Sequence, residues 1–116
     1  MKLLVSGGAG FIGSNFVHLV LKERPDYQIS VIDKLSYAGN KTSLNSVLDK
    51  IKFVEGDICD QELIDSLVAD CDVVVHFAAE SHNDNSLANP WPFVESNLIG
   101  TYQILEAVRN HGKRLH

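Results

Sequence analysis

The stretch VSGGAGFIG, from Val5 to Gly13, decides the fold of this 116-residue chain. It contains two overlapping patterns, Gly-x-x-Gly-x-x-Gly and Gly-x-Gly-x-x-Gly, which are formed by Gly7, Gly8, Gly10 and Gly13. An apolar run precedes the glycines and a segment with helical spacing follows them, which is the strand–turn–helix context of a dinucleotide-binding loop. Such glycines permit a tight turn and the approach of a pyrophosphate, and the N–H groups at the helix start point at that anion. The alternative is a glycine turn that binds no ligand.

Apolar runs and amphipathic segments alternate outward from this stretch. Strands are predicted at residues 2–6, 28–33, 51–56 and 72–79, and helices at residues 13–23, 61–68 and 90–110. A weaker helix is predicted after the Gly39-Asn40 turn, and KRLH at residues 113–116 resembles the start of a fifth strand. The fourth run, DVVVHFAA, is apolar almost throughout, as in a parallel sheet that helices cover on both faces. We therefore predict an α/β fold: a Rossmann-type doubly wound parallel sheet with strand order 3-2-1-4, truncated after about four strands.

The composition is that of an ordinary globular protein, with 45% hydrophobic and 22% charged residues. A net charge of −5 repels phosphate backbones, so no nucleic-acid partner is expected. No apolar run reaches the about 20 residues that a membrane helix needs, and glycines interrupt the short apolar start, so neither a membrane span nor a signal peptide is expected. The two cysteines, Cys59 and Cys71, are expected to be reduced thiols of a cytoplasmic protein.

Acidic residues follow the second and third predicted strands. Asp33 lies 20 residues beyond Gly13, where a carboxylate can bind the adenosine ribose and repel a 2′-phosphate, which favours NAD over NADP. Lys34 is a neighbouring cation that could soften this repulsion. Asp57 could receive the adenine amino group and Ile58 could lie against the ring, because ligands bind beyond the carboxyl ends of such strands. Without the glycine loop, Asp57 would be an ordinary turn residue.

The stretch HFAAESHNDNS, residues 76–86, leaves the fourth strand at the switch point where cofactor and substrate meet. Ala78 and Ala79 are small enough for a nicotinamide ribose to approach the backbone. Residues 81–85 are dense in hydrogen-bonding groups, as a sugar site would be, although a hydrated loop is the alternative. His76 and His82 could be metal ligands, but a core position for His76 and loop or substrate hydrogen bonds for His82 are favoured, so no metal is predicted.

Five segments together resemble the dTDP-glucose 4,6-dehydratase family, a branch of the extended short-chain dehydrogenases/reductases: VSGGAGFIGSNF, DKLSYAGN, GDICD, AAESHNDNS and ESNLIGTYQILEA. The resemblance covers essentially the whole chain. It implies NAD contacts at Gly7, Gly10, Phe11, Ile12, Gly13, Asp33, Lys34, Leu35, Ser36, Asp57, Ile58, Phe77, Ala78, Ala79, Glu80 and Ser96. It also implies that Ser81 touches the sugar nucleotide. Ser6 and Ser96 each stand where the family usually has threonine, and both keep the hydroxyl.

The resemblance implies NAD-dependent dehydration of dTDP-glucose to dTDP-4-keto-6-deoxyglucose, a step of deoxysugar synthesis. A hydride leaves C4 of the sugar for NAD, water is lost across C5 and C6, and the hydride returns to C6. The protein must supply a base for the C4 hydroxyl and an acid–base pair for the elimination. In the family the base is a tyrosine with a lysine four residues on, and the pair is Asp-Glu after a threonine.

Tyr37 and Lys41 have this Tyr-x-x-x-Lys spacing but follow the second strand instead of the fifth. The intervening Gly39 and Asn40 disfavour a shared helical face, so a turn that shapes the cofactor pocket is favoured. No Thr-Asp-Glu triplet occurs in the sequence. We therefore predict no catalytic residue, and we expect residues 1–116 to form the NAD-binding Rossmann domain of a larger enzyme. The rest of the catalytic core and the C-terminal substrate domain would lie outside this chain, which alone should be inactive.

Two alternatives stay open: another NAD-dependent nucleotide-sugar epimerase or dehydratase, and a non-catalytic NAD-binding module. The expected partners are dTDP-glucose in the parent enzyme and further copies in a homo-oligomer. The long helix at residues 90–110 could form part of a dimer face. An unpaired apolar edge on the fourth strand, VVVHFAA, also predicts self-association.

Overall fold

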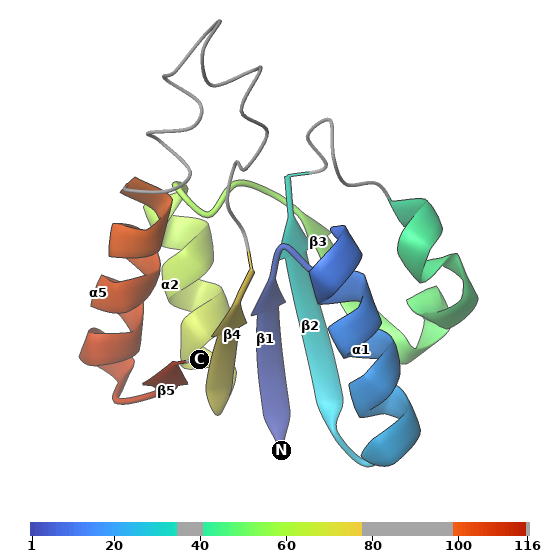
Figure 1. Ribbon diagram of the computed structural model, residues 1–116. Helices are drawn as coiled ribbons and strands as arrows, with labels where there is room; N and C mark the ends of the chain where they lie inside the picture. The colour runs from blue at the N-terminus through green and yellow to red at the C-terminus, as the bar shows by residue number, and fades with distance from the viewer. Residues whose placement is uncertain (35–40, 78–98, 116) are drawn as a thin grey trace, which may run out of the picture.

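The computed structural model describes residues 1–34, 41–77 and 99–115 and contains a parallel sheet between two layers of helices (Figure 1). Within these residues the sheet has five strands in the order β3-β2-β1-β4-β5. These are β1 (Lys2–Ser6), β2 (Gln28–Asp33), β3 (Ile51–Glu55), β4 (Val73–His76) and β5 (Arg114–Leu115). The predicted doubly wound sheet and the order of its first four strands are confirmed.

The helices lie on opposite faces of the sheet: α1 (Phe11–Glu23) and the 3-10 helix η1 (Lys41–Lys50) on one, α2 (Gln61–Ala69) and α5 (Thr101–His111) on the other (Figure 1). Local signals fix the helix ends. The Asp60 carboxylate accepts a hydrogen bond from the Leu63 N–H at 3.2 Å and so caps α2, as the sequence predicts. Gly112 ends α5 with a left-handed φ of 64°.

Two apolar clusters hold the layers together, because alternate residues of a strand face opposite sides of the sheet. On the α2–α5 side, the buried sheet residue Leu4 packs with Ile64 of α2 and Ile104 of α5. On the α1 side, Val5 packs with Val17 of α1 and Leu44 of η1. The neighbouring β1 residues Leu4 and Val5 thus contribute to the two clusters on opposite faces of the sheet.

The edge beside β4 differs from the prediction. β4 ends at His76 instead of residue 79, and β5 pairs with Val73 and Val74, so the first half of β4 is covered by a neighbouring strand. The two residue pairs of this ladder, Val73 with Arg114 and Val74 with Leu115, remove this part of the edge. The part of the predicted long helix before residue 99 lies outside the described residues.

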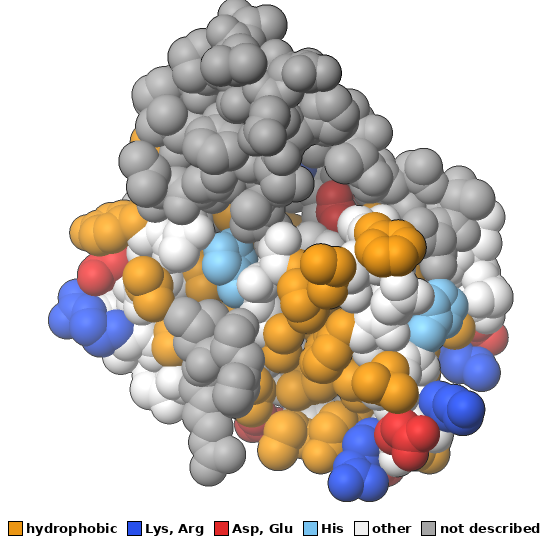
Figure 2. All heavy atoms as spheres, viewed as in Figure 1, with side chains coloured by type: hydrophobic (Ala, Val, Ile, Leu, Met, Phe, Trp, Pro, Cys, Tyr) orange, Lys and Arg blue, Asp and Glu red, His pale blue; other side chains and the backbone are white. Residues whose placement is uncertain are grey.

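Some large apolar side chains stay on the surface. They are Met1, Phe11, Ile12, Leu19, Ile99, Tyr102 and Leu105. Figure 2 shows hydrophobic side chains gathered over β1 and α1 on one face of the molecule. No helix in the described parts of the chain has the length and apolar character needed to cross a bilayer.

Candidate functional site

The glycine loop joins β1 to α1 and is tied to β2. Gly7 has a φ of 73°, a left-handed conformation that glycine adopts readily. Its N–H donates to the Ile32 carbonyl at 2.8 Å, and its own carbonyl accepts from the Gly10 N–H at 3.2 Å. A Cβ on Gly13 would collide with the Gly7 carbonyl oxygen. These two glycines therefore give the tight turn and the close helix–strand approach that the sequence predicts.

Gly10 is different, because neither its backbone nor its packing requires glycine. Its φ of −73° and ψ of 175° suit any residue. A Cβ there would find only the Gly7 carbonyl oxygen, at 3.5 Å, among the described residues. As far as the described residues go, the space beside Gly10 is thus open, and a side chain would fill part of it. This is the shape expected where a ligand approaches the backbone.

The start of α1 suits an anion. Gly10 precedes it without a capping side chain, and its first turn holds no acidic residue. The positive end of the helix dipole is therefore not balanced within the helix, and a pyrophosphate would supply that charge. Phe11 and Ile12 are 83% and 66% exposed on the same turn, where they could contact a bound dinucleotide. The residues of this loop fit the diphosphate of NAD.

Asp33, at the end of β2, supports the glycine loop directly. Its Oδ2 accepts a hydrogen bond from the Ala9 N–H at 2.9 Å, and its carbonyl accepts from the Gly56 N–H at 3.1 Å. The carboxylate thus lies beside the loop, close to where a ribose would follow the pyrophosphate. The sequence predicted Asp33 but missed Ala9, because a backbone donor leaves no mark in the residue type.

Asp57 and Lys34 form an ion pair beyond the ends of β3 and β2, with 3.4 Å between Nζ and Oδ2. Burial opposes ionisation of Asp57, but the Cys59 N–H, which donates to Oδ1 at 2.9 Å, and the Lys34 ammonium outweigh it. The pKa of the Asp57 carboxyl therefore lies below its usual value. Ile58 is only 5% exposed and packs in the core beneath Gly100.

His76, the last residue of β4, also lies at this end of the sheet and contacts two hydroxyl groups. Its Nδ1 lies 2.6 Å from the Ser6 Oγ and its Nε2 lies 2.9 Å from the Thr101 Oγ1. Burial lowers the pKa of the imidazole, so the neutral ring is favoured. The next residue, Phe77, turns to the other face of the sheet and packs against Phe16 of α1, with 5.4 Å between ring centroids.

The structure brings together all ten of the predicted site residues that it describes, at the carboxyl ends of β1 to β4. These are Gly7, Gly10, Phe11, Ile12, Gly13, Asp33, Lys34, Asp57, Ile58 and Phe77. The other predicted site residues lie outside the described residues: Leu35, Ser36, Ala78, Ala79, Glu80, Ser81 and Ser96. Tyr37 also lies outside them, and Lys41 opens η1. Sequence reasoning missed the role of Thr101.

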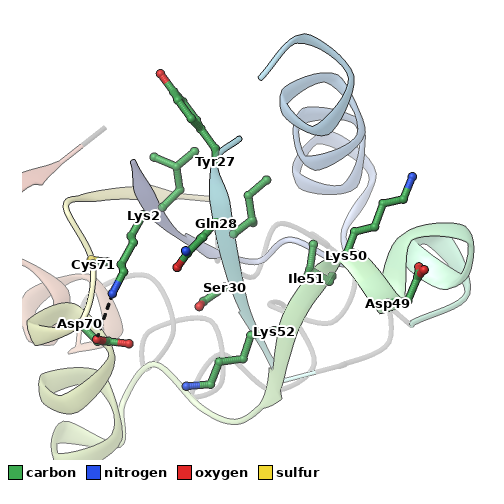
Figure 3. A pocket seen from close by; sticks show the side chains of 12 residues that line it. Lys2, Tyr27, Gln28, Ser30, Asp49, Lys50, Ile51, Lys52, Asp70 and Cys71 are labelled. Atoms are coloured by element: carbon green, nitrogen blue, oxygen red, sulfur yellow. Dashed lines mark ion pairs between the residues drawn. The ribbon is translucent and has the colours of Figure 1, made fainter. Parts of the chain in front are cut away.

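A hollow of about 350 Å³ lies at the opposite end of the sheet (Figure 3). Lys2, Gln28, Ser30, Lys52 and Asp70 are among its lining residues, and the Lys2 ammonium lies 3.8 Å from the Asp70 carboxylate. Ligands of doubly wound sheets bind beyond the carboxyl ends of the strands. This hollow is at the amino ends, so its size does not make it the candidate site.

Comparison with known proteins agrees with this geometry. Residues 4–116 match the GDP-mannose 4,6 dehydratase family. The chain belongs to this family. The chain is also 61% identical, over all 116 residues, to a dTDP-glucose 4,6-dehydratase of Mycobacterium tuberculosis. The match covers 35% of that protein, so the chain spans about a third of the length of the curated relatives it matches.

Solved structures share the same fold. The dTDP-glucose 4,6-dehydratase DesIV from Streptomyces venezuelae, solved with NAD bound, superposes with a TM-score of 0.91 and 43% identity, over 99% of this chain and 38% of DesIV. A UDP-glucose 4-epimerase from Thermotoga maritima superposes with a TM-score of 0.87 and 32% identity, over 97% of this chain and 35% of the epimerase. The GDP-mannose 4,6 dehydratase family fold is therefore shared with sugar-nucleotide epimerases.

Proposed function

We propose that this chain is the NAD-binding domain of a dTDP-glucose 4,6-dehydratase. The observation that carries the proposal is the glycine loop, where the open space beside Gly10 meets the uncapped start of α1. The 61% identity with the mycobacterial enzyme supports the substrate, because the epimerase shares the fold at only 32% identity. A sugar-nucleotide epimerase and a non-catalytic NAD-binding module are the alternatives.

The bound NAD would supply reversible hydride transfer to and from the sugar. The glycine loop, with Phe11 and Ile12, would bind the pyrophosphate. Asp33 would orient the adenosine ribose, and Asp57 with the backbone of Ile58 would border the adenine. By family resemblance, further contacts to NAD would come from Lys34, Leu35, Ser36, Phe77, Ala78, Ala79, Glu80 and Ser96. Ser81 would contact the sugar nucleotide. The proton-transfer residues of the reaction would belong to the remainder of the parent enzyme.

Titration of the chain with NAD⁺ tests the cofactor proposal. Gly10→Ala should weaken binding about tenfold or more, because the added methyl group occupies the space beside the pyrophosphate. Its thermal midpoint should stay close to that of the wild type, since this backbone conformation suits alanine. Gly13→Ala is the contrasting variant: it should lower both the midpoint and the affinity. Equal NAD⁺ affinity of wild type and Gly10→Ala would contradict the proposed pyrophosphate site.

Incubation with NAD⁺ and dTDP-glucose tests whether residues 1–116 bind the cofactor without catalysing the reaction. We expect NAD⁺ binding without formation of the 4-keto-6-deoxy sugar, because none of the predicted proton-transfer residues lies in residues 1–116. Product from a sample free of longer enzyme would contradict this domain assignment. It would also direct attention to Tyr37 and Lys41. In the parent enzyme, competition between dTDP-glucose and UDP-sugars would separate dehydratase from epimerase.

The proposal includes a cytoplasmic homo-oligomer. Cys59 and Cys71 form no disulfide, which supports a reducing compartment. Three exposed apolar residues, Ile99, Tyr102 and Leu105, recur at a spacing of three, from just before α5 into its first turns, and support a helix-mediated contact between copies.

A further inference from the structure

The Ser6–His76–Thr101 bridge links three segments at the carboxyl end of the sheet. Ser6 ends β1 directly before the glycine loop, and it is fully buried. It lies opposite His76 in the parallel register of β1 and β4. Thr101 opens α5. The imidazole therefore connects the loop that leads to α1 with the first turn of a helix on the other face of the sheet.

The geometry uses both ring nitrogens. Nδ1 lies 2.6 Å from one hydroxyl and Nε2 lies 2.9 Å from the other, so one nitrogen donates and the other accepts in a neutral ring. Each hydroxyl can donate or accept, so the side chains of Ser6 and Thr101 can rotate to suit either neutral tautomer. Burial lowers the pKa of His76, which agrees with a ring that stays neutral. The two groups that meet the ring, from β1 and α5, are uncharged.

A second contact joins the same strand ends. The Phe77 N–H donates to the Ser6 carbonyl at 2.8 Å, so β4 is held to β1 up to the last described residue before position 78. Ser6 is thus held through its backbone and its side chain, one residue before the left-handed Gly7. A shift of Ser6 would move the loop that α1 follows.

We propose that His76 is a positioning residue for the nucleotide site: held between the hydroxyls of Ser6 and Thr101, its imidazole fixes the glycine loop relative to α5. This inference rests on the proposed NAD site. It assigns to His76 no contact with the cofactor and no proton transfer. Its effect passes through Ser6 to the loop backbone that would bind the pyrophosphate.

Two variants of Thr101 test the bridge without removing the ring. Thr101→Val replaces the hydroxyl by a methyl group of similar size, and Thr101→Ser keeps the hydroxyl. Thr101→Val should weaken NAD⁺ binding about three- to tenfold, the loss expected for one hydrogen bond, and Thr101→Ser should restore most of it. In ¹⁵N spectra of the wild type, the His76 ring should hold one neutral tautomer at about pH 7, and Thr101→Val should shift its Nε2 resonance.

The outcomes separate this role from the proposed function. NAD⁺ binding by the wild type, with no change in Thr101→Val, would overturn the positioning role alone. Equal losses in Thr101→Val and Thr101→Ser would also overturn it, because packing and not the hydroxyl would then matter. Failure of the wild type to bind NAD⁺, at full folding, would overturn the proposed function and this role with it. A restored affinity in Thr101→Ser together with the shifted resonance supports the bridge.

Discussion

At the scale of single residues, the pair Lys34–Asp57 controls how much free positive charge lies beside Asp33. With the ammonium 3.4 Å from the Asp57 carboxylate, the charge of Lys34 is partly neutralised, so the repulsion that Asp33 is proposed to exert on a 2′-phosphate would be maintained. Asp57→Asn should therefore raise the affinity for NADP⁺ relative to NAD⁺, by about three- to tenfold at low ionic strength. Titration with both cofactors gives the ratio.

Lys34→Met in the Asp57→Asn background is the matched control for this selectivity. It should cancel the gain, since the released cation is what would attract the 2′-phosphate. A gain that survives Lys34→Met would show that the lost Asp57 charge acts on the cofactor directly. No change in the ratio for Asp57→Asn would contradict the argument.

The buried imidazole of His76 also predicts how stability changes with pH. Its pKa is lower in the folded chain than the about 6.5 of an exposed histidine, so the unfolded state binds the proton first. The contribution of neutral His76 to the free energy of unfolding is complete above about pH 6.5. It is lost as the pH falls through the folded pKa, by up to about 1.4 kcal/mol for each pH unit. Asp57, whose folded pKa is also lowered, contributes above its unfolded value of 3.8 and loses this only in stronger acid.

Urea unfolding of the wild type and His76→Asn, measured between about pH 5 and pH 8, isolates this effect. The difference in unfolding free energy between the two chains should be largest near neutral pH and shrink in mild acid. Other histidines contribute equally to both chains and cancel. A difference that is constant over this range would mean that the folded ring titrates like an exposed one.

At the scale of elements, the sequence was sufficient wherever one local signal decides the structure. Apolar runs gave β1 and β2 at their observed bounds, and Asp60 marked the start of α2. The weak helix after Gly39-Asn40 formed as the 3-10 helix η1. The predicted bounds were wrong where pairing with neighbouring strands sets the end of a strand. At the end of β4 the apolar composition continues to Ala79, but the ladder ends at His76.

The same distinction separates the predicted from the missed parts of the site. The glycines and Asp33 follow from spacing, but the link between Asp33 and the Ala9 N–H depends on how the loop folds back on β2. The His76 bridge needed the register that places Ser6 opposite His76 and the packing that brings Thr101 to the ring, 25 residues along the chain. Strand register and helix packing depend on tertiary contacts, so a residue pattern alone does not predict them.

The cap of α2 gives a prediction for one element. Asp60→Ala removes the acceptor for the Leu63 N–H and should lower the unfolding free energy by about 1 kcal/mol. Asp60→Asn keeps a capping oxygen and should cost much less. Chemical denaturation of the three chains at neutral pH measures both changes. Equal losses for alanine and asparagine would show that the Asp60 charge near the helix dipole, and not the cap, is the stabilising interaction.

At the scale of the whole molecule, the exposed apolar residues of α5 contrast with its buried face. Ile104, Ala107 and Val108 pack against the core, whereas Tyr102 and Leu105 are 58% and 48% exposed. A helix that is apolar on two sides needs a second surface to cover it. We expect this surface to be α5 of another copy, so the chain should self-associate at micromolar concentration.

Leu105→Glu tests this contact, because it places a charge in the apolar stripe without touching the core. It should convert the assembly to monomers in light scattering after size exclusion, with little change in the thermal midpoint. Leu19→Glu is the matched control: Leu19 is 56% exposed on α1, at the other face of the sheet. If both variants dissociate the assembly, the contact depends on general surface hydrophobicity. If neither does and the wild type associates, the part of the β4 edge that β5 does not pair, at Val75 and His76, becomes the better candidate among the described residues, because strand pairing does not depend on α5.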